Sequence, residues 1–287
     1  MRIVLDHIGL TYPGPVVGLR DTTATFEGRL IGVLGHNGSG KSTLIRLLTG
    51  ELVPTTGTVH IEGQPVRAHG RISYFPQEVP RFPLAQTPRQ TLANSLVLAR
   101  VTDPARVEEM ATTLLELVGL AEEMDRPVGT FSGGMKQKVR IAQALVHNPS
   151  ALVLDEPTTG LDVEERLSIL QLLHRLRVRI PVIFSTHDCA DVAAVCDMVV
   201  ILARGRLVEA APPEQMTARV TGQVWEWIIP DLDHLREASM GITRLHRTEG
   251  GIRVRAVGTS PPGGAASVTP TLEDAYVYLT RMANDGP

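Results

Sequence analysis

The residues best suited to chemistry form the nine-residue stretch GHNGSGKST at positions 35–43. This stretch matches the pattern G-x-x-x-x-G-K-[ST] and lies between an apolar run that predicts a strand and an apolar run that predicts a helix, as phosphate-binding loops require. Glycines let successive backbone N–H groups converge on phosphate oxygens, and the N-terminus of the following helix adds partial positive charge. The predicted phosphate-contacting residues are Gly35, His36, Asn37, Gly38, Ser39, Gly40, Lys41, Ser42 and Thr43.

Two side chains of this stretch have distinct predicted roles. Lys41 neutralises the β- and γ-phosphate oxygens, and the Ser42 hydroxyl ligates Mg²⁺. The alternative is a glycine-rich turn that binds nothing, but the lysine and the serine both stand in register with the pattern. We therefore expect Lys41 to take part in catalysis as well as in binding.

Adjacent carboxylates follow a second apolar run, in ALVLDEP at residues 151–157. Ligands of open α/β sheets bind at the carboxyl ends of the strands, which is where Asp155 and Glu156 stand. We expect Asp155 to hold Mg²⁺, directly or through water, and Glu156 to orient or deprotonate the water that attacks the γ-phosphate. Taken alone, such a pair is more often a solvated turn, so this interpretation depends on the phosphate loop.

Polar side chains also end two other predicted strands. His187 closes PVIFSTH and is a candidate to hold the γ-phosphate, although an isolated histidine at a strand end is usually structural or exposed. Gln77 closes RISYFPQ, and its amide can reach Mg²⁺ or the attacking water. The alternative for Gln77 is a solvated turn residue.

A pair of glycines opens a predicted helix in FSGGMKQKV, residues 131–139. Ser132 suits the N-cap, and Gly133 and Gly134 then occupy the first helical positions, where glycine costs up to ~1 kcal/mol relative to alanine. Either something approaches this backbone closely or the cost is incidental.

The elements that must position these residues indicate an α/β fold. Short apolar runs in RLIGVLG, ALVLDE, PVIFSTHD and DMVVIL, separated by segments with helical periodicity, predict a largely parallel sheet. The runs RIVLDHIGLTY, GTVHIEGQPV and RISYFPQ predict an antiparallel portion beside it. Residues 87–120 read as helical, with Asp103 as an N-cap and Pro104 as the first helical residue.

The C-terminal part has a different character. Residues 222–256 predict a strand, a helix and a hairpin that turns at Gly250 and Gly251. The last helix opens with Thr271 and Asp274 as a capping box. Every predicted nucleotide-binding residue precedes this part, so we expect removal of residues 222–287 to leave the phosphate site intact.

Composition limits the class of protein. A chain of 287 residues with 43% hydrophobic content has room for one large domain and a small one. The 28 basic and 31 acidic residues give a net charge of −3, which does not indicate a nucleic-acid partner. Cys189 and Cys196 are expected to be free thiols in a reducing compartment, and no apolar run approaches the length of a membrane span.

Taken in order, these motifs resemble the ATP-binding subunit of an ABC transporter over residues 1–220. The motifs that carry the resemblance are residues 35–43, Gln77, SGGMKQ from Ser132, Asp155 with Glu156, GLD at 160–162, and His187. The resemblance implies a P-loop NTPase core, with a mostly parallel sheet, an antiparallel β portion and a helical subdomain near residues 78–150. A small α+β accessory domain is expected at residues 221–287.

The resemblance also assigns roles that the residues alone do not. In that family, the serine and glycines equivalent to Ser132, Gly133 and Gly134 hold the γ-phosphate of ATP bound to a second ATP-binding subunit, in a homodimer or a heterodimer. Tyr12 resembles the aromatic residue that stacks on adenine, and Asp162 the residue that crosses the dimer interface. The helical segment near residues 78–130 resembles the part that docks a membrane permease. Phe131 and Met135 depart from the common leucine and glutamine of the signature.

The segments QVWEW at residues 223–227 and PTLEDAYVYLT at 270–280 are similar to the tails of ATPases from two-component drug, antibiotic or peptide exporters. The predicted function is therefore hydrolysis of ATP to power export through a separate permease, by a peripheral subunit at the cytoplasmic face of the cell membrane. The alternatives are an importer or lipid transporter of the same superfamily, and a non-transport ATPase switch acting on DNA or the ribosome. A single phosphate loop and the 54 residues between Gln77 and Ser132 argue against the switch.

Overall fold

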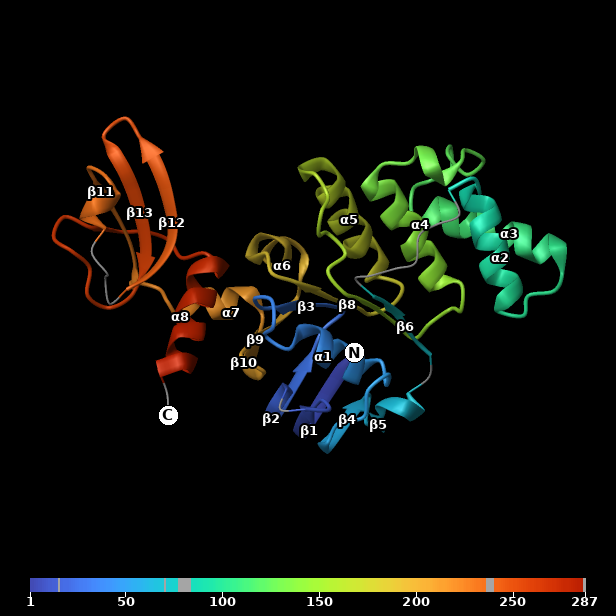
Figure 1. Cartoon of the computed structure of the whole chain (residues 1–287), viewed down its shortest axis with the longest axis horizontal. Helices are drawn as coiled ribbons and strands as arrows, with labels where there is room; N and C mark the ends of the chain where they lie inside the picture. Colours follow the sequence, from blue (N-terminus) through green and yellow to red (C-terminus); the bar gives the residue numbers. More distant parts are fainter. Residues whose placement is uncertain (15, 70, 77–83, 236–239, 286–287) are drawn as a thin grey trace.

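The computed structural model describes residues 1–14, 16–69, 71–76, 84–235 and 240–285 (Figure 1). At its centre is a six-stranded sheet with strand order β10-β9-β3-β8-β7-β6, in which only β10 runs antiparallel to its neighbour. The strands are β3 (Leu30–Leu34), β6 (Ile72–Phe75), β7 (Ala151–Leu154), β8 (Val182–Thr186), β9 (Met198–Ala203) and β10 (Arg206–Ala211). The largely parallel sheet predicted from the sequence is confirmed.

Both faces of the central sheet are buried. Along β3, Leu30 and Leu34 belong to one apolar cluster, whereas Ile31 and Val33 belong to another. Alternate side chains of one strand therefore pack on opposite faces, which explains why the parallel strands read as continuous apolar runs.

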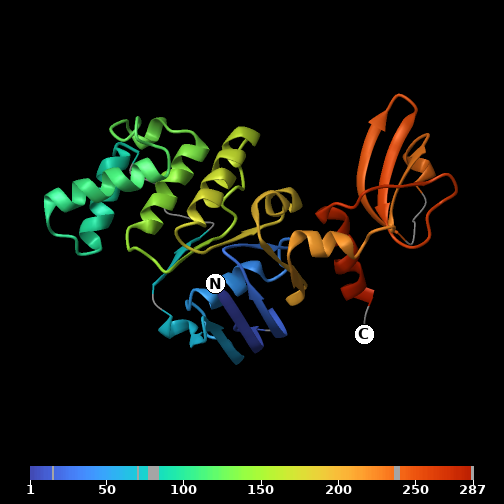
Figure 2. The ribbon, with the colours of Figure 1, turned by 180° about the vertical axis from the view of Figure 1, so that it is seen from behind.

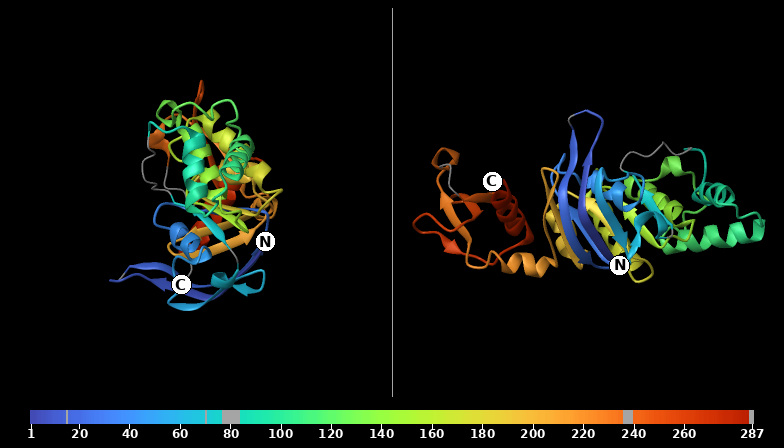
Figure 3. Two further views of the ribbon diagram at one scale, coloured as in Figure 1. Left: turned by 90° about the vertical axis from the view of Figure 1, so that its right-hand side faces the viewer. Right: turned by 90° about the horizontal axis from the view of Figure 1, so that it is seen from below.

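An antiparallel sheet covers one face, together with α1 (Lys41–Leu48), as seen from below in Figure 3. Its strand order is β2-β1-β4-β5. Its elements and the short helix that follows are β1 (Arg2–Thr11), β2 (Val17–Glu27), β4 (Thr56–Ile61), β5 (Gln64–Pro65) and η1 (Val66–Ala68). The antiparallel portion is thus confirmed for two of the three predicted runs.

The third run was predicted wrongly. Residues 72–75 form β6, which pairs in parallel with β7 at the edge of the central sheet. The described residues between β6 and β7 contain three α-helices, and a crossover of this kind joins parallel strands. The residues of so short a strand do not by themselves reveal which sheet it joins.

A group of helices lies at one end of the molecule (Figure 2). It contains α2 (Pro88–Leu98), α3 (Pro104–Leu117), η2 (Val128–Thr130) and α4 (Gly133–Leu145), and α5 (Val163–Leu176) lies beside it. The predicted start of α3 is confirmed, because Asp103 is its N-cap and accepts a hydrogen bond from the Ala105 N–H at 3.2 Å. The helical subdomain therefore follows the sequence pattern closely in these residues.

At the opposite end lies a third sheet, with strand order β12-β13-β11-β14 (Figure 1). Its strands are β11 (Val224–Ile229), β12 (Gly241–Thr248), β13 (Gly251–Val257) and β14 (Ala266–Ser267). The strand and the hairpin predicted here are confirmed. The helix predicted between them is, among the described residues, only the single turn η3 (Leu232–His234), where the Asp231 carboxylate accepts the Asp233 N–H. Such a side-chain bond gives the backbone an alternative to a regular helix.

Three further helices join the sheets: α6 (Cys189–Val195), α7 (Pro213–Ala218) and α8 (Leu272–Asp285). The predicted cap of α8 is confirmed, because the Thr271 N–H donates to the Asp274 carboxylate at 2.8 Å and the Asp274 N–H donates to the Thr271 hydroxyl at 3.4 Å. Cys189 and Cys196 are free thiols. No helix in the described ranges is long and apolar enough to cross a membrane.

Candidate nucleotide site

The phosphate loop joins the carboxyl end of β3 to the N-terminus of α1. Gly38 and Gly40 have φ angles of 76° and 103°, which lie in the left-handed region that glycine adopts at little cost. A side chain at Gly35 would collide with the Ser39 hydroxyl at 2.3 Å and the Leu202 carbonyl oxygen at 2.6 Å. The glycines that the sequence pattern requires are therefore also required by the local backbone.

Lys41 folds back over this loop. Its ammonium group donates to the carbonyl oxygens of Gly35 at 2.8 Å and His36 at 3.2 Å. The same nitrogen lies 3.4 Å from the carboxylate of Glu156, and both side chains are largely buried. The structure therefore brings the predicted phosphate lysine and the predicted base to one point.

Sheet order explains how distant residues meet there. Because β3, β8 and β7 are parallel neighbours, the loop after β3, His187 after β8, and Asp155 with Glu156 after β7 lie at the same sheet edge. His187 Nδ1 lies 3.9 Å from Glu156 Oε1. Asp155 is buried and accepts a hydrogen bond from the Ser185 hydroxyl, which in turn accepts the Glu156 N–H at 2.9 Å.

The backbone of Glu156 is unusual, with φ at 48° in a residue other than glycine. This conformation costs on the order of 1–3 kcal/mol and persists only where the surroundings hold it. Here the Ser185 hydroxyl holds the Glu156 N–H, and the Thr159 hydroxyl donates to the Glu156 carboxylate at 2.9 Å. Strain held in this way is common at functional sites.

A pocket of about 350 Å³ opens beside the loop. It is lined by Tyr12, Val16, Val17, Gly18, Asn37, Gly38, Gly40, Lys41, Ser42, Thr43 and Glu156. The Tyr12 hydroxyl is 3.0 Å from the Thr43 hydroxyl, so the aromatic residue selected from the sequence does reach the phosphate loop. Sequence reasoning missed Val16, Val17 and Gly18; a side chain at Gly18 would approach the Tyr12 ring to 2.7 Å.

These residues fit a nucleotide. The loop offers an uncrowded left-handed turn at Gly38 and a buried cation at Lys41. The buried Ser39 hydroxyl has no hydrogen-bond partner among the residues that the structure describes. For Mg²⁺, Ser42 and Asp155 offer the oxygen ligands that the ion prefers. Gln77, the third predicted ligand, lies outside the described residues, and the described part contains no cluster of three or more acidic, His or Cys side chains suited to a metal.

The signature segment lies elsewhere in the chain. Ser132 is the N-cap of α4, as predicted, and accepts the Met135 N–H at 3.2 Å. Asp162 is the N-cap of α5 and accepts the Glu165 N–H at 2.8 Å. Among the described residues that line the nucleotide pocket, none comes from either segment. The chain therefore does not bring Ser132, Gly133, Gly134 or Asp162 to its own phosphate loop.

Glu165 is a residue near the signature that sequence reasoning missed. Hydrogen bonds from the Ser132 side chain and then from the Gly134 backbone lower the pKa of its carboxyl group. A side chain at Gly134 would lie 2.9 Å from the Glu165 Cβ, so close packing inside the chain also requires glycine there. The only sequence signal is an acidic residue in the first turn of a helix, which usually marks nothing more than a favourable helix dipole.

An ion-pair network around the buried Asp191 connects α5 to the segment after His187. Arg166 contacts Asp188 at 2.6 Å and Asp191 at 2.5 Å, and the Thr158 hydroxyl also donates to Asp191 at 2.8 Å. Asp191 is almost fully buried. The network therefore holds the loop after Glu156 and the loop that carries His187 in a fixed relation.

Comparison with known proteins shows the family to which this chain belongs. The sequence profile described as "ABC transporter" matches residues 21–159. The methionine import ATP-binding protein MetN 2 of Bacillus licheniformis is 35% identical over 233 residues, which cover 74% of this chain and 68% of the relative. The Nod factor export ATP-binding protein I of a Rhizobium species is 37% identical over 216 residues, covering 74% and 70%. This chain belongs to the ATP-binding subunits of ABC transporters.

Two other ABC proteins show how much of the chain is similar in sequence and in fold. An uncharacterised ABC transporter ATP-binding protein of Bacillus subtilis, YxlF, is 38% identical over 181 residues, which are 63% of this chain and 61% of the relative. The ADP conformation of the ATP-binding cassette MJ1267 has a TM-score of 0.66 at 24% identity, covering 77% of this chain and 94% of that one. At that level of identity, the structural likeness shows the fold of an ABC ATP-binding subunit.

Proposed function

We propose that this ABC subunit binds ATP in the pocket beside residues 35–43 and hydrolyses it. The observation that carries the proposal is the meeting of Lys41 and Glu156, 3.4 Å apart at the mouth of a glycine loop. The loop N–H groups and Lys41 would hold the phosphates, and Tyr12 would stack on adenine at the pocket wall. Val17 and Gly18 would border the base or ribose.

Glu156 is the proposed general base. Its carboxylate would orient and deprotonate the attacking water, and His187, 3.9 Å from that carboxylate, would hold the γ-phosphate. Mg²⁺, when bound, neutralises charge on the β- and γ-phosphate oxygens. We propose that Ser42, Asp155 and Gln77 hold it, with Asp155 oriented by Ser185.

The signature residues would serve a second subunit. Ser132 caps, and Gly133 and Gly134 begin, the 13-residue helix α4, which contributes nothing to the described lining of the chain's own pocket. Their N–H groups would contact ATP bound to a partner chain, and the partner would in return complete this chain's site. Asp162 would cross the same interface. The partner would be a second copy or a related ATP-binding subunit.

The proposed biological role is to power export through a separate membrane permease, at the cytoplasmic face of the membrane. The tail segments at residues 223–227 and 270–280 and the Nod factor export relative favour export. The MetN relatives favour import as the second candidate. In the proposed division of the chain, residues 1–220 form the ATP-binding domain, and residues 221–287 form an accessory domain built on the third sheet.

Two variants test ATP hydrolysis. Lys41→Ala should lose ATP binding in the isolated chain, because the described residues that line the pocket include no other lysine or arginine to face the phosphates. Glu156→Gln should keep binding but lose turnover by ~10²- to 10⁴-fold in the complex with its copurified membrane subunit. The control is Glu164→Gln, which removes an exposed carboxylate of α5 and should leave both quantities unchanged.

Near-normal turnover of Glu156→Gln would move the base elsewhere, and normal ATP binding by Lys41→Ala would refute the phosphate-loop assignment. The identity of the membrane subunit that copurifies decides between export and import.

A further inference from the structure

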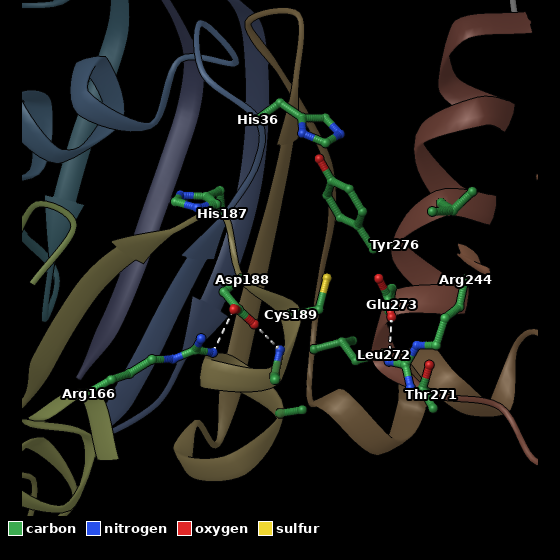
Figure 4. Close-up of a pocket in the computed structure, with 13 residues that line it drawn as sticks. His36, Arg166, His187, Asp188, Cys189, Arg244, Thr271, Leu272, Glu273 and Tyr276 are labelled. Carbon is green, nitrogen blue, oxygen red and sulfur yellow. Dashed lines mark hydrogen bonds and ion pairs between the residues drawn. The ribbon is translucent and has the colours of Figure 1, made fainter. Parts of the chain in front are cut away.

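The last helix of the chain reaches the phosphate loop, although every nucleotide motif precedes it. The rings of Tyr276 in α8 and His36 in the loop meet edge to face, with centroids 5.4 Å apart and planes at 72°. Figure 4 shows the Tyr276 phenol directed at His36. This contact joins the third sheet and its helix to the backbone that would hold phosphate.

Tyr276 is fixed in place. It is 6% exposed and belongs to the large apolar cluster, with Leu272 and Ala275 of the same helix. Burial, and then the neighbouring Cys189, raises the pKa of its hydroxyl to about 12, against a hydrogen bond from the backbone of His36 that lowers it. The hydroxyl is therefore protonated at physiological pH.

The contact involves more of the loop than His36. A cavity of about 320 Å³ is lined by loop residues 36–39, by residues 202–204 at the end of β9 and just after it, and by Tyr276 and Thr280 of α8. The loop residues whose N–H groups would contact phosphate thus lie between β9 and α8. The other side of His36 is held by Lys41, which binds its carbonyl oxygen.

The opposite face of α8 is bound to the third sheet. Asp274 is fully buried and pairs with Arg255 of β13 at 2.7 Å. Asp274 and Tyr276 are two residues apart, so their side chains point about 200° apart around the helix. One turn of α8 therefore contacts the sheet with one face and the phosphate loop with the other.

The larger cavity that Figure 4 shows, about 610 Å³ between α6 and α8, lies directly below this contact. His36, His187 and Tyr276 all line it. The Tyr276 ring therefore links α8 directly to the loop of the nucleotide site.

We infer that Tyr276 is a positioning residue, which holds His36 and with it the first half of the phosphate loop in the conformation that receives ATP. This inference rests on the proposed ATP site. It assigns to the C-terminal unit a part in nucleotide affinity, contrary to the sequence-based expectation that removal of residues 222–287 leaves the phosphate site intact.

A double-mutant cycle on the full-length chain tests the inference, with ATP affinity measured by titration calorimetry. Tyr276→Leu keeps an apolar side chain but loses the ring contact and the hydroxyl, so we expect roughly fivefold to tenfold weaker ATP binding. In a His36→Ala background, the same change should weaken binding by less than about threefold, because part of the contact is already lost. The control is Tyr278→Leu, at the second tyrosine of α8, which should leave affinity unchanged.

The outcomes are distinct. If Tyr276→Leu weakens ATP binding equally in the wild-type and His36→Ala backgrounds, or if Tyr278→Leu weakens it as much, the effect is a general one of the helix and the inference is overturned. If Tyr276→Leu does not fold, Tyr276→Phe decides: about threefold weaker binding supports the inference, and unchanged binding overturns it. Failure of the wild-type chain to bind ATP would refute the proposed function instead.

Discussion

Replacement of Asp274 by alanine should lower the free energy of unfolding of the third sheet. The carboxylate is fully buried and accepts hydrogen bonds from Thr243 at 2.7 Å, from the Thr271 N–H and hydroxyl at 2.8 Å, and from Arg255. Breaking a buried ion pair from one side costs about 3–5 kcal/mol, because the remaining charge loses its partner. Arg255 keeps Glu226 at 2.9 Å, so the lower end of that range, about 3 kcal/mol, applies.

Tryptophan fluorescence is the assay that isolates this sheet. The two tryptophans of the chain, Trp225 and Trp227, both lie in β11, so urea denaturation followed by their fluorescence reports on the third sheet. The matched control is Glu273→Ala, which removes the neighbouring carboxylate, whose ion pair with Arg244 is largely exposed. That pair is worth at most about 1 kcal/mol. A loss below about 1 kcal/mol for Asp274→Ala, or a loss equal to the control, would refute the reasoning.

The same carboxylate gives a pH dependence. Burial raises the pKa of Asp274, but hydrogen bonds from Arg255, Thr243 and Thr271 more than offset it, so the pKa is lower in the folded chain than in the unfolded chain. The stabilising contribution is therefore complete above the unfolded pKa of about 4 and is lost as pH falls through the folded value. The difference in unfolding free energy between wild type and Asp274→Asn should be constant near neutral pH and shrink in acid.

Three other predictions follow from the sites described. Gly134→Ala should destabilise the chain by about 1–3 kcal/mol in thermal or urea unfolding, because its Cβ would lie 2.9 Å from the Glu165 Cβ. The control Gly133→Ala should cost less, because its Cβ would first meet the ends of flexible side chains. Equal stability of the two variants would contradict this prediction. Burial raises the pKa of the Cys189 thiol to about 12, so in the folded chain at pH 8 Cys189 should react with iodoacetamide far more slowly than in urea. The more buried Cys196 should do the same. Rapid labelling of the folded chain, detected by mass spectrometry, would contradict this prediction. A dimer of one Lys41→Ala chain and one Ser132→Arg chain should occlude ATP at one site, because both substitutions then fall in the other site. Neither mutant homodimer should occlude ATP. A stable mixed dimer that occludes no ATP would contradict the shared site.

The central sheet and the nucleotide motifs could be predicted because their signals are local. An apolar run followed by GHNGSGKST or by Asp155 and Glu156 marks a strand and its carboxyl end, and parallel pairing then brings those ends together. The capping residues Ser132, Asp103 and Thr271 were likewise predictable from their immediate neighbours.

The remaining features depend on contacts between distant segments. The sheet that β6 joins depends on the helical crossover that follows it. The sequence marks Asp274 as a helix cap, but its buried ion pair with Arg255 depends on the tertiary fold. Helical spacing places Tyr276 on the apolar face of α8, but no sequence signal predicts its contact with His36 or the contact of Glu165 with the signature. A single sequence records what each segment prefers, whereas these contacts depend on where segments finally lie.

The position of α8 in the chain also sets an order of events during synthesis. The ribosome makes this helix after every other element described, including β3, α1 and the loop between them. Because β3 lies between β8 and β9, the phosphate loop can fold only after residue 203 is made, and at about 5–20 residues per second Tyr276 then follows roughly 4–15 seconds later. If Tyr276 positions that loop, nascent chains bind ATP weakly throughout this interval, and only chains made as far as α8 compete for nucleotide and for a partner subunit.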